Sequence, residues 1–430
     1  MIDTDAAPGS TEYCEFDAED LLKYIGARTA LTRHLGGHSG DWHAEELYGG
    51  NLNRVFVIRG PDGALCAKQS LPYFRLLGTG TQMPLNRIHF ERHTLVTHAK
   101  FAAARIPLVY HFDPALRLLV MQYLDGYQTL RSALMNGQSC EHVGPQLGEY
   151  LALVIFNTSD LTLDPAQRRR HVATMADNSG MYRFIEDLMF TEPYMLHPRN
   201  AWNAPYLDSI ACEFRTDLAL KVAVSRLKRR YMTAGEVLLH GDLHTDSVLV
   251  NAYDTRVIDL ELSLYGPLGW DLAMLFAHLL LNYYSCDGRA DNPVQLERCR
   301  TGALTLLETI WQCFECTIIR LWQAGRAGQA VPGAWFGDDN GGTELETAVL
   351  QALLADVLHD AAGFAGAEIT RRILNLGQVP DLQSIANQEQ RARCETGALR
   401  LARDLIVNTA QYTSAQKIAA AARAQRNNAR

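Results

Sequence analysis

The sequence predicts an α+β fold of two lobes, in which a small β-rich N-terminal lobe precedes a larger, mostly helical C-terminal lobe. Apolar residues alternate with period two in the first part of the chain, and helical spacing dominates from Gly144 onward. One short β segment, from Val237 to Ile258, interrupts the helices. The expected lobes are residues 1–124 and 125–430, with a hinge near Tyr123 to Gly126.

Composition excludes several classes of protein. The 430 residues are 47% hydrophobic and carry 40 basic and 48 acidic side chains, a net charge of −8, so nonspecific nucleic-acid binding is not expected. The acidic N-terminus lacks the apolar core of a signal peptide, and the longest apolar run, Leu272 to Leu281, is too short to span a bilayer. Cys313 and Cys316 form a C-x-x-C in a helical apolar pattern, which favours core packing over zinc or redox chemistry. We therefore expect a cytoplasmic protein without nucleic-acid or membrane partners.

The elements follow in order from these patterns. Asp17 to Leu35 has helical spacing with Asp17 as N-cap, and the alternation on either side of Pro61-Asp62-Gly63 predicts a β-hairpin. The remaining expected elements are a helix at 88–104, strands at 108–111 and 118–122, helices at 182–188 and 210–231, and a frayed helix at 413–430.

The most informative stretch is Leu238-Leu239-His240-Gly241-Asp242-Leu243-His244, where an apolar strand runs into a turn that carries His, Gly and Asp. Protein kinases place a catalytic Asp and a metal-binding Asn in this arrangement, in the motif H-R-D-L-x-x-x-N. Asp242 takes the position of the Asp, and Ser247 takes that of the Asn. The alternative is that His240 and Asp242 only satisfy the backbone groups of a turn.

Two carboxylates follow the next apolar strand, in Val257-Ile258-Asp259-Leu260-Glu261. Alternate side chains of an extended chain point the same way, so Asp259 and Glu261 can face one hard cation while Leu260 packs behind them. Magnesium on nucleotide phosphates is bound through such carboxylates. An ordinary acidic strand end is the alternative.

Two elements of the N-terminal lobe could hold nucleotide phosphates. Lys68 lies in the second hairpin strand, like the lysine of the kinase V-A-I-K motif, and Glu91 of the following helix is its expected partner. The segment Gly49 to Asn53 would cover the phosphates, because glycines permit close backbone approach, although the pattern G-x-G-x-x-G is absent. Solvated surface charge is the alternative for the Lys–Glu pair.

Three more charged positions lie in the C-terminal lobe. Asp271, in Gly269-Trp270-Asp271-Leu272-Ala273, is expected to cap the following helix or brace the Asp242 turn rather than perform chemistry. Arg371 and Arg372 follow a helical stretch of small residues, and adjacent arginines can grip phosphates or sugar hydroxyls. A solvated helix face explains the two arginines equally well from these residues alone.

Together these segments resemble the methylthioribose kinase family, a branch of the aminoglycoside-phosphotransferase-like kinases, which have a protein-kinase-like fold. The likeness runs from about Asp17 to Leu382, and its His-Gly-Asp element is shared across the superfamily. Other matching pieces are Lys68-Gln69-Ser70-Leu71-Pro72-Tyr73 and Pro84-Leu85 with Arg87. The more specific ones are Gly50-Asn51-Leu52-Asn53, Tyr265-Gly266-Pro267-Leu268-Gly269 before Asp271, and Arg371-Arg372.

The resemblance implies ATP-dependent phosphorylation of the anomeric C1 hydroxyl of 5-methylthioribose, a methionine-salvage step, by a Mg²⁺-dependent homodimer. It implies that ATP binds between the lobes, that Asp242 is the catalytic base, and that Asp259 and Glu261 hold magnesium. The residues expected at the sugar are Asp242, His244, Arg371 and Arg372. Those expected at the nucleotide are Gly49, Gly50, Asn51, Asn53, Lys68, Glu91, Gln122 and Leu124.

Four segments depart from the family's pattern. Asp259-Leu260-Glu261 replaces the usual Asp-Pro-Glu, and Asp246 stands where glycine is usual, adding negative charge near the triphosphate. The loop 78–83 lacks the family's Gly-Glu-Ser-Trp pattern, and the hinge at 121–125 differs from the usual acidic version. We expect the chemistry to survive these changes, whereas an altered lid can change which 5-substituted sugar fits.

Two rival functions stay open. The first is a kinase for another 5-modified ribose, such as 5-deoxyribose, or for an aminoglycoside, although the strongly acidic cleft expected for aminoglycosides is not evident from the sequence. The second is a noncatalytic pseudokinase that acts as a binding module. It is disfavoured because Lys68, Asp242, Asp259 and Glu261 are all present together.

Overall fold

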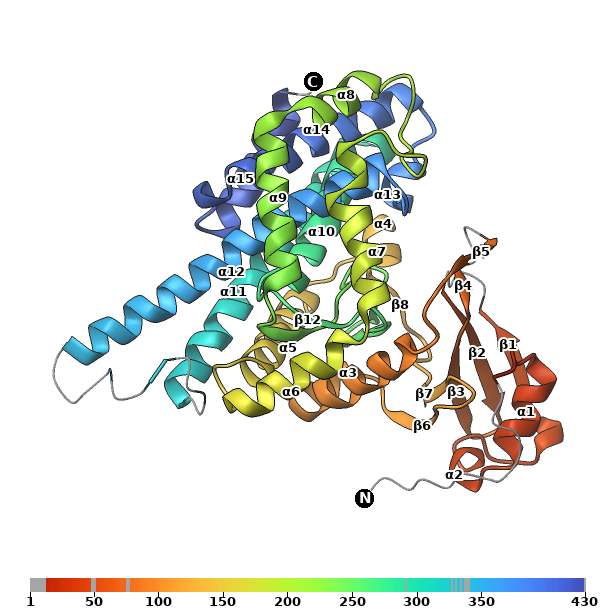
Figure 1. Ribbon diagram of the computed structural model, residues 1–430. Coiled ribbons are helices and arrows are strands. Elements are labelled where there is room, and N and C mark those ends of the chain that lie inside the picture. The colour runs from red at the N-terminus through yellow and green to blue at the C-terminus, as the bar shows by residue number, and fades with distance from the viewer. Residues whose placement is uncertain are drawn as a thin grey trace. The chain divides into compact units, whose positions relative to one another are not determined.

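The computed structural model describes residues 13–47, 52–74, 78–290, 292–325, 328, 331–332, 335 and 341–428. The chain forms two compact units, the first made of residues up to Thr97 and Pro107–Asp125, the second of His98–Ile106 and Gly126 onward. The first unit is β-rich and the second is mostly helical (Figure 1), which confirms the α+β class. Gly49, Gly50 and Asn51 lie outside the described residues. The expected functional division at Leu124 stays a prediction.

The first unit contains one five-stranded antiparallel sheet in the order β1-β2-β3-β7-β6. The predicted hairpin is confirmed, because Gly60 pairs with Gly63 across the turn. A separate pair of short strands, β4 and β5, lies in the same unit. The strands are β1 His43–Glu46, β2 Asn53–Gly60, β3 Gly63–Ser70, β4 Tyr73–Phe74, β5 Gly78–Gln82, β6 Val109–Asp113 and β7 Leu118–Gln122.

Two short helices, α1 (Ala18–Gly26) and α2 (Thr29–Thr32), pack against this sheet where one helical stretch was expected. Asp17 is the N-cap of α1, as predicted, since its side chain accepts a hydrogen bond from the Asp20 backbone at 2.8 Å. Apolar side chains of the helices and the sheet form one core, including Leu21, Ile25, Leu31, Phe56, Ile58, Leu65 and Val120. The predicted helix at 88–104 is α3 (Arg87–Ala102), followed by the 3₁₀ turn η3 (Ala103–Arg105).

The second unit is built around α10 (Trp270–Arg289), in which every residue from Trp270 to Cys286 is buried. It packs against α11, α12 and α14, while α5 lies along α11. The other helices of this unit are α4 Leu130–Met135, α5 Val143–Thr158, α6 Pro165–Ala176, α7 Ser179–Phe190, α8 Asp208–Thr216, α9 Leu218–Thr233, α11 Pro293–Ala324, α12 Gly341–Leu374, α13 Pro380–Gln383, α14 Gln388–Val407 and α15 Ala415–Asn428. Its 3₁₀ turns include η4 Glu192–Tyr194 and η6 Thr409–Gln411, and the first unit contains η1 Ser39–Asp41.

The predicted β segment of the helical unit is confirmed and forms two small sheets. Strand β10 (Val248–Val250) pairs with β11 (Thr255–Val257) and with β8 (Gln128–Thr129), and β9 (Val237–Leu239) pairs with β12 (Leu264–Gly266). These sheets hold the turn that carries Asp242.

Another predicted helix, like the one at 17–35, needs correction. The helix expected at 210–231 is two helices, because Asp217 ends α8 and caps α9 with a hydrogen bond from the Leu220 backbone at 3.0 Å. Helix α12 is also long and apolar enough to cross a membrane by length and composition, which the longest apolar run in the sequence did not suggest. Its C-terminal part is largely buried inside the helical unit, and a core helix passes the same test.

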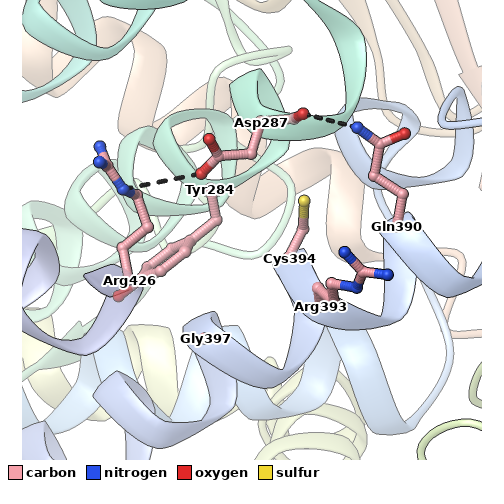
Figure 2. A pocket seen from close by; sticks show the side chains of 7 residues that line it. All are labelled: Tyr284, Asp287, Gln390, Arg393, Cys394, Gly397 and Arg426. Atoms are coloured by element: carbon pink, nitrogen blue, oxygen red, sulfur yellow. Dashed lines mark hydrogen bonds and ion pairs between the residues drawn. The ribbon is translucent and has the colours of Figure 1, made fainter. Parts of the chain in front are cut away.

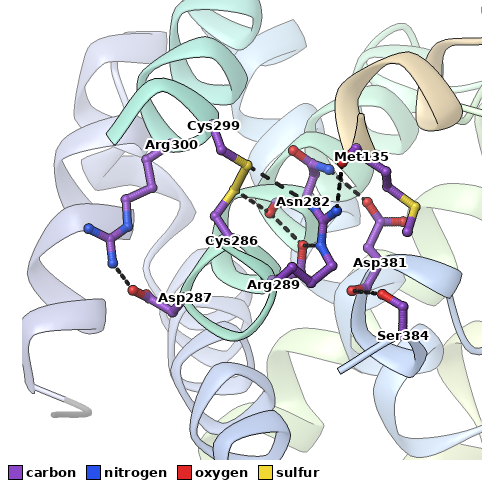
Figure 3. The surroundings of a disulfide bond; sticks show 10 residues. Met135, Asn282, Cys286, Asp287, Arg289, Cys299, Arg300, Asp381 and Ser384 are labelled. Atoms are coloured by element: carbon purple, nitrogen blue, oxygen red, sulfur yellow. Dashed lines mark hydrogen bonds and ion pairs between the residues drawn. A yellow bond between two sulfur atoms is a disulfide. The ribbon is translucent and has the colours of Figure 1, made fainter. Parts of the chain in front are cut away.

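The cysteines also differ from expectation. Cys286 at the end of α10 forms a disulfide with Cys299 of α11, a pairing that the scattered cysteines of the sequence did not indicate (Figure 3). Arg289 lies beside it and donates hydrogen bonds to Ser285 and to the Met135 carbonyl. The expected core packing of the C-x-x-C is wrong for its second residue, since Cys313 is half-buried and Cys316 is exposed.

Close packing of α5 against α11 gives a test of the fold. A Cβ added to Gly148 would lie 2.5 Å from the Ile310 carbonyl oxygen and 2.8 Å from the Cys313 Cβ. We expect Gly148→Ala to lower the free energy of unfolding by about 1–3 kcal/mol. The control Gly302→Ala, on α11 with open space around it, should raise that free energy by about 0.5–1 kcal/mol. Urea denaturation followed by circular dichroism measures both, and similar shifts in the two variants would contradict the packing.

Candidate active site

The candidate site begins with the His-Gly-Asp loop, residues 240–247, which connects β9 to β10. Gly241 has φ +92°, a conformation that residues with a side chain rarely adopt, and an added Cβ would collide with the Leu262 carbonyl. Trp270 donates a hydrogen bond from its indole to the Gly241 carbonyl oxygen at 2.8 Å. The loop therefore requires glycine between the histidine and the aspartate.

Asp271, in the first turn of α10, braces this loop. One carboxylate oxygen accepts a hydrogen bond from the His240 backbone at 2.8 Å, and the other accepts one from the Gly241 backbone at 3.0 Å. Burial raises the pKa of Asp271 to about 7, although the two backbone N–H groups act in the opposite direction. The bracing that the sequence predicted is confirmed.

His240 ties the loop to the segment that carries the second pair of acids. Its Nδ1 accepts a hydrogen bond from the Asp242 backbone at 3.2 Å, so its Nε2 carries the proton and donates to the Ile258 carbonyl at 2.8 Å. Burial lowers the pKa of His240 to about 4, so the imidazole is neutral. His240 is therefore a positioning group with both ring nitrogens in use.

Asp242 lies among cationic and hydrogen-bonding groups with 21% of its side chain exposed. Its Oδ2 is 3.4 Å from His244 Nε2, and its Oδ1 is 3.6 Å from Arg372 and 3.9 Å from Arg371. Burial acts to raise the pKa of Asp242, yet His244, Arg372 and Arg371 together hold it below its ordinary value. Asp242 is thus an ionised, partly accessible carboxylate.

His244 is oriented by the same loop. Its Nδ1 accepts hydrogen bonds from the Asp246 and Ser247 backbones, both at 3.2 Å, which directs its Nε2 toward Asp242. Ser247, at the position of the kinase asparagine, donates its hydroxyl proton to the Asp242 carbonyl oxygen at 3.0 Å. Ser247 therefore closes the loop by a local hydrogen bond.

Arg371 and Arg372 lie in the last turn of α12 and are not a solvated helix face. The exposed fractions of their side chains are 6% and 10%. Both guanidinium groups are bound by Glu368, which is fully buried one helical turn earlier. Glu368 was missed in the sequence, where its spacing of three and four residues from the arginines was an available signal.

Asp259 and Glu261 come together by a different backbone route from the one expected. Asp259 has φ +69°, in the left-handed region, and Glu261 begins a turn, so the extended geometry predicted for this segment is wrong. An oxygen of each carboxylate nevertheless lies within 4.8 Å of the other. Asp259 is exposed, Glu261 is buried, and Leu260 packs in the core. Two hard oxygen donors at this separation suit a cation such as Mg²⁺.

The first unit contains the predicted lysine–glutamate pair. Lys68 Nζ lies 2.9 Å from Glu91 Oε1, and both side chains are buried, which confirms the ion pair and excludes solvated surface charge. Asn53 is also buried, and its Oδ1 accepts a hydrogen bond at 3.0 Å from Arg87, which also binds three backbone carbonyls of this region, among them that of Leu52.

Two further residues expected at the nucleotide lie at the end of this unit. Gln122 ends β7, and its side chain accepts a hydrogen bond from the Leu108 backbone at 3.4 Å. Leu124 is buried.

The negative charge of Asp246, which stands where the family has glycine, is compensated by Arg131. Asp246 forms an ion pair with Arg131 at 2.6 Å, and Arg131 also binds the buried Asp381 at 2.5 Å. Arg131, Asp381 and His278, which contacts both Arg131 and Glu368, were not found from the sequence, because 250 residues separate Arg131 from Asp381.

A cavity of about 240 Å³ lies elsewhere in the helical unit, between α10, α14 and α15 (Figure 2). Within its lining, Arg426 lies 3.8 Å from Asp287, and Gln390 donates a hydrogen bond to the Asp287 backbone carbonyl at 2.8 Å. It contains none of the predicted site residues.

Comparison with known proteins identifies relatives of the whole chain. A model of the phosphotransferase enzyme family matches residues 43–294. Methylthioribose kinase 2 of Oryza sativa subsp. japonica is 33% identical over 403 residues, which cover 94% of each chain. The methylthioribose kinase of Escherichia coli O45:K1 is 34% identical over 416 residues, covering 96% of this chain and 98% of its own.

Among solved structures, the Plasmodium vivax ethanolamine kinase matches with a TM-score of 0.45 and 12% identity, over 87% of this chain and 86% of its own. A glucosamine kinase in complex with glucosamine, ADP and inorganic phosphate also has a TM-score of 0.45 and 12% identity, over 89% and 85%.

The Asp271 brace gives a pH-dependent prediction. At pH 8, where Asp271 is ionised, we expect Asp271→Asn to lower the free energy of unfolding by about 1–3 kcal/mol, because an amide NH₂ would face a backbone N–H donor. The folded-state pKa, about 7, lies above the ordinary value of 3.8, so this group's contribution to stability falls as pH rises between those values. The free energy of unfolding of the wild type should therefore exceed that of the variant by more at pH 5 than at pH 8. Each unit of pKa shift corresponds to about 1.4 kcal/mol. A difference that did not change with pH in urea denaturation would contradict this assignment.

Proposed function

The chain belongs to the phosphotransferase enzyme family and, within it, to the methylthioribose kinases, and from this premise we propose that it transfers the γ-phosphoryl group of ATP to the C1 hydroxyl of 5-methylthioribose. The product would be 5-methylthioribose 1-phosphate, an intermediate of methionine salvage. The observation that carries the proposal is an ionised Asp242 facing two buried arginines, in a chain that matches methylthioribose kinases over nearly its full length.

Asp242 would orient the attacking hydroxyl and accept its proton. The cationic groups around Asp242 keep its pKa low, so it is a carboxylate at neutral pH but a weak base. A weak base suffices for phosphoryl transfer through a loose transition state, because positioning and charge stabilisation supply most of the catalysis. His244 would fix the carboxylate by its contact with Oδ2, which leaves Oδ1 directed toward the arginines.

Arg371 and Arg372 would bind hydroxyl oxygens of the sugar. Their closest atoms are 3.9 and 3.6 Å from Asp242 Oδ1, longer than the usual charge-assisted hydrogen bond. The two groups are thus attracted to the carboxylate without being locked onto it. A sugar hydroxyl can then replace part of that interaction at little desolvation cost, because both arginines are already buried.

The first unit would hold the nucleotide, with Lys68 contacting the phosphates and Glu91 fixing the lysine. Asp259 and Glu261 would hold Mg²⁺, and their two carboxylates fit the oxygen ligands that this ion prefers. When bound, Mg²⁺ neutralises charge on the phosphate oxygens. Asp246 adds no uncompensated charge, because Arg131 pairs with it.

Two finer assignments are part of the proposal. We place the enzyme in the cytoplasm, as its composition predicts, and we propose that it is a homodimer, as the family resemblance implies. A different 5-substituent on the ribose is the second candidate, and the altered segment 78–83 favours testing it.

A coupled assay of ATP consumption tests the reaction. We expect turnover with 5-methylthioribose, less with 5-deoxyribose and ribose, and none with aminoglycosides, and ³¹P NMR should place the new phosphate on C1.

Asp242→Asn should reduce kcat by about a hundredfold or more while ADP binding stays unchanged, since it removes the base and the orienting charge. Absence of turnover with any 5-substituted ribose would refute the proposed function, and wild-type turnover by Asp242→Asn would refute the role of that residue.

The magnesium site can be tested by binding as well as by rate. We expect Asp259→Asn to weaken Mg²⁺–ADP binding in calorimetry and to raise the Mg²⁺ concentration needed for half-maximal turnover by at least about tenfold, because one anionic ligand is lost. Glu213→Gln, which neutralises an exposed acid on α8, is the matched control. An unchanged magnesium requirement in Asp259→Asn would exclude Asp259 as a ligand.

A further inference from the structure

Glu368 has an unusual number of partners for one carboxylate. Its Oε2 accepts a hydrogen bond from Arg371 Nε at 2.7 Å, and its Oε1 accepts bonds from Arg371 at 2.7 Å and Arg372 Nε at 2.6 Å. His278 of α10 makes the fourth contact of this carboxylate, to Oε1 at 3.1 Å. The side chain is fully buried, so all of its bonds are made within the protein.

Helix geometry explains why the two arginines need such a partner. Successive residues of an α-helix point about 100° apart, so adjacent side chains diverge unless something draws them together. Arg371 and Arg372 nevertheless converge on one oxygen of Asp242. Glu368, three and four residues earlier on the same helix, lies where it can reach both guanidinium groups.

The charges of this group are balanced by Glu368. Burial acts to raise the pKa of Glu368, but Arg371 and Arg372 hold it well below its ordinary value, so the group is a carboxylate. Burial and the charge of Arg371 lower the pKa of Arg372. Without Glu368, two buried cations would face each other with only Asp242 to compensate them.

His278 connects this cluster to the other side of the His-Gly-Asp loop. Its Nδ1 lies 3.2 Å from Arg131, which can only donate, so the proton of a neutral ring is on Nε2 and points at Glu368. Burial lowers the pKa of His278 well below its ordinary value, which agrees with a neutral ring. Its ring centroid lies 5.0 Å from that of His244.

Arg131 connects His278 to the His-Gly-Asp loop. Its guanidinium binds Asp246 at 2.6 Å, and its backbone donates to the Thr245 carbonyl at 3.0 Å. Asp381 fixes the same guanidinium from the other side and accepts a hydrogen bond from Asn282 at 2.9 Å. The contacts thus leave the loop at Asp242 and rejoin it at Asp246.

We propose that Glu368 is the positioning residue of the sugar site, which aims Arg371 and Arg372 at the sugar beside Asp242, and that His278 and Arg131 fix it relative to the His-Gly-Asp loop. This inference rests on the proposed function, because it names how that same site is held. Glu368 itself touches no reacting atom and acts through the arginines.

The test separates sugar binding from nucleotide binding. Glu368→Gln keeps the volume of the side chain but places an amide against guanidinium donors, so the KM for 5-methylthioribose should rise about tenfold or more while the KM for ATP stays unchanged. Glu368→Asp keeps the charge and should give a smaller rise. Asp356→Asn, an exposed acid on the same helix, is the matched control and should change neither constant. Equal increases in both KM values, or none, would overturn the proposal.

A double-mutant cycle tests whether Glu368 acts through the arginines. In an Arg371→Met/Arg372→Met background, Glu368→Gln should raise the sugar KM no further, whereas an independent, multiplicative increase would overturn the proposal. Thermal unfolding accompanies each variant, and failure of both Glu368→Gln and Glu368→Asp to fold would assign the residue to stability alone and overturn its positioning role. Wild type that did not phosphorylate 5-methylthioribose would refute the proposed function instead, and the cycle would then be measured on the sugar that is turned over.

Discussion

The attraction between one partly exposed carboxylate, Asp242, and two buried guanidinium groups is the interaction on which the site depends. If these groups were fully exposed, solvent would screen them, and the carboxylate would keep an ordinary affinity for protons. If they paired tightly, neither partner could bind a substrate. The separations of 3.6 and 3.9 Å lie between these limits, and they persist because both arginines are held from behind by Glu368.

The fold meets this requirement largely through one helix. Helix α10 braces the His-Gly-Asp loop with Asp271 in its first turn and contacts Glu368 and Arg131 through His278 two turns later. Asn282, one turn further, binds Asp381. Because every residue of α10 from Trp270 to Cys286 is buried, these polar groups have fixed surroundings and few alternative partners. The helix therefore serves as core and as scaffold for the site.

Local patterns made much of this predictable. The hairpin with Lys68, its ion pair with Glu91 and the bracing by Asp271 all follow from motifs whose members lie within 31 residues of one another. Hydrophobic periodicity predicted the helical character of the second unit and located several of its helices. It could not locate the break at Asp217, because a capping interaction overrides the apolar pattern there.

What the sequence could not supply was burial and long-range partnership. The sequence around Arg371 and Arg372 is compatible with a solvent-exposed helix face and with a contact to a buried glutamate. Only the structure shows that both arginines bind Glu368. The pairing of Cys286 with Cys299 and the contacts of Arg131 depend on how helices pack. Asp259 illustrates a further limit, because its left-handed backbone brings its carboxylate near Glu261 by a route that strand alternation does not describe.

A crystal structure of the enzyme with 5-methylthioribose bound would examine the central claim most directly. The account predicts that the C1 hydroxyl oxygen lies within hydrogen-bond distance of Asp242 Oδ1, with other sugar hydroxyls on Arg371 and Arg372 and both guanidinium groups still on Glu368. A sugar bound away from Asp242, with the two arginines taking no part in its recognition, would contradict it.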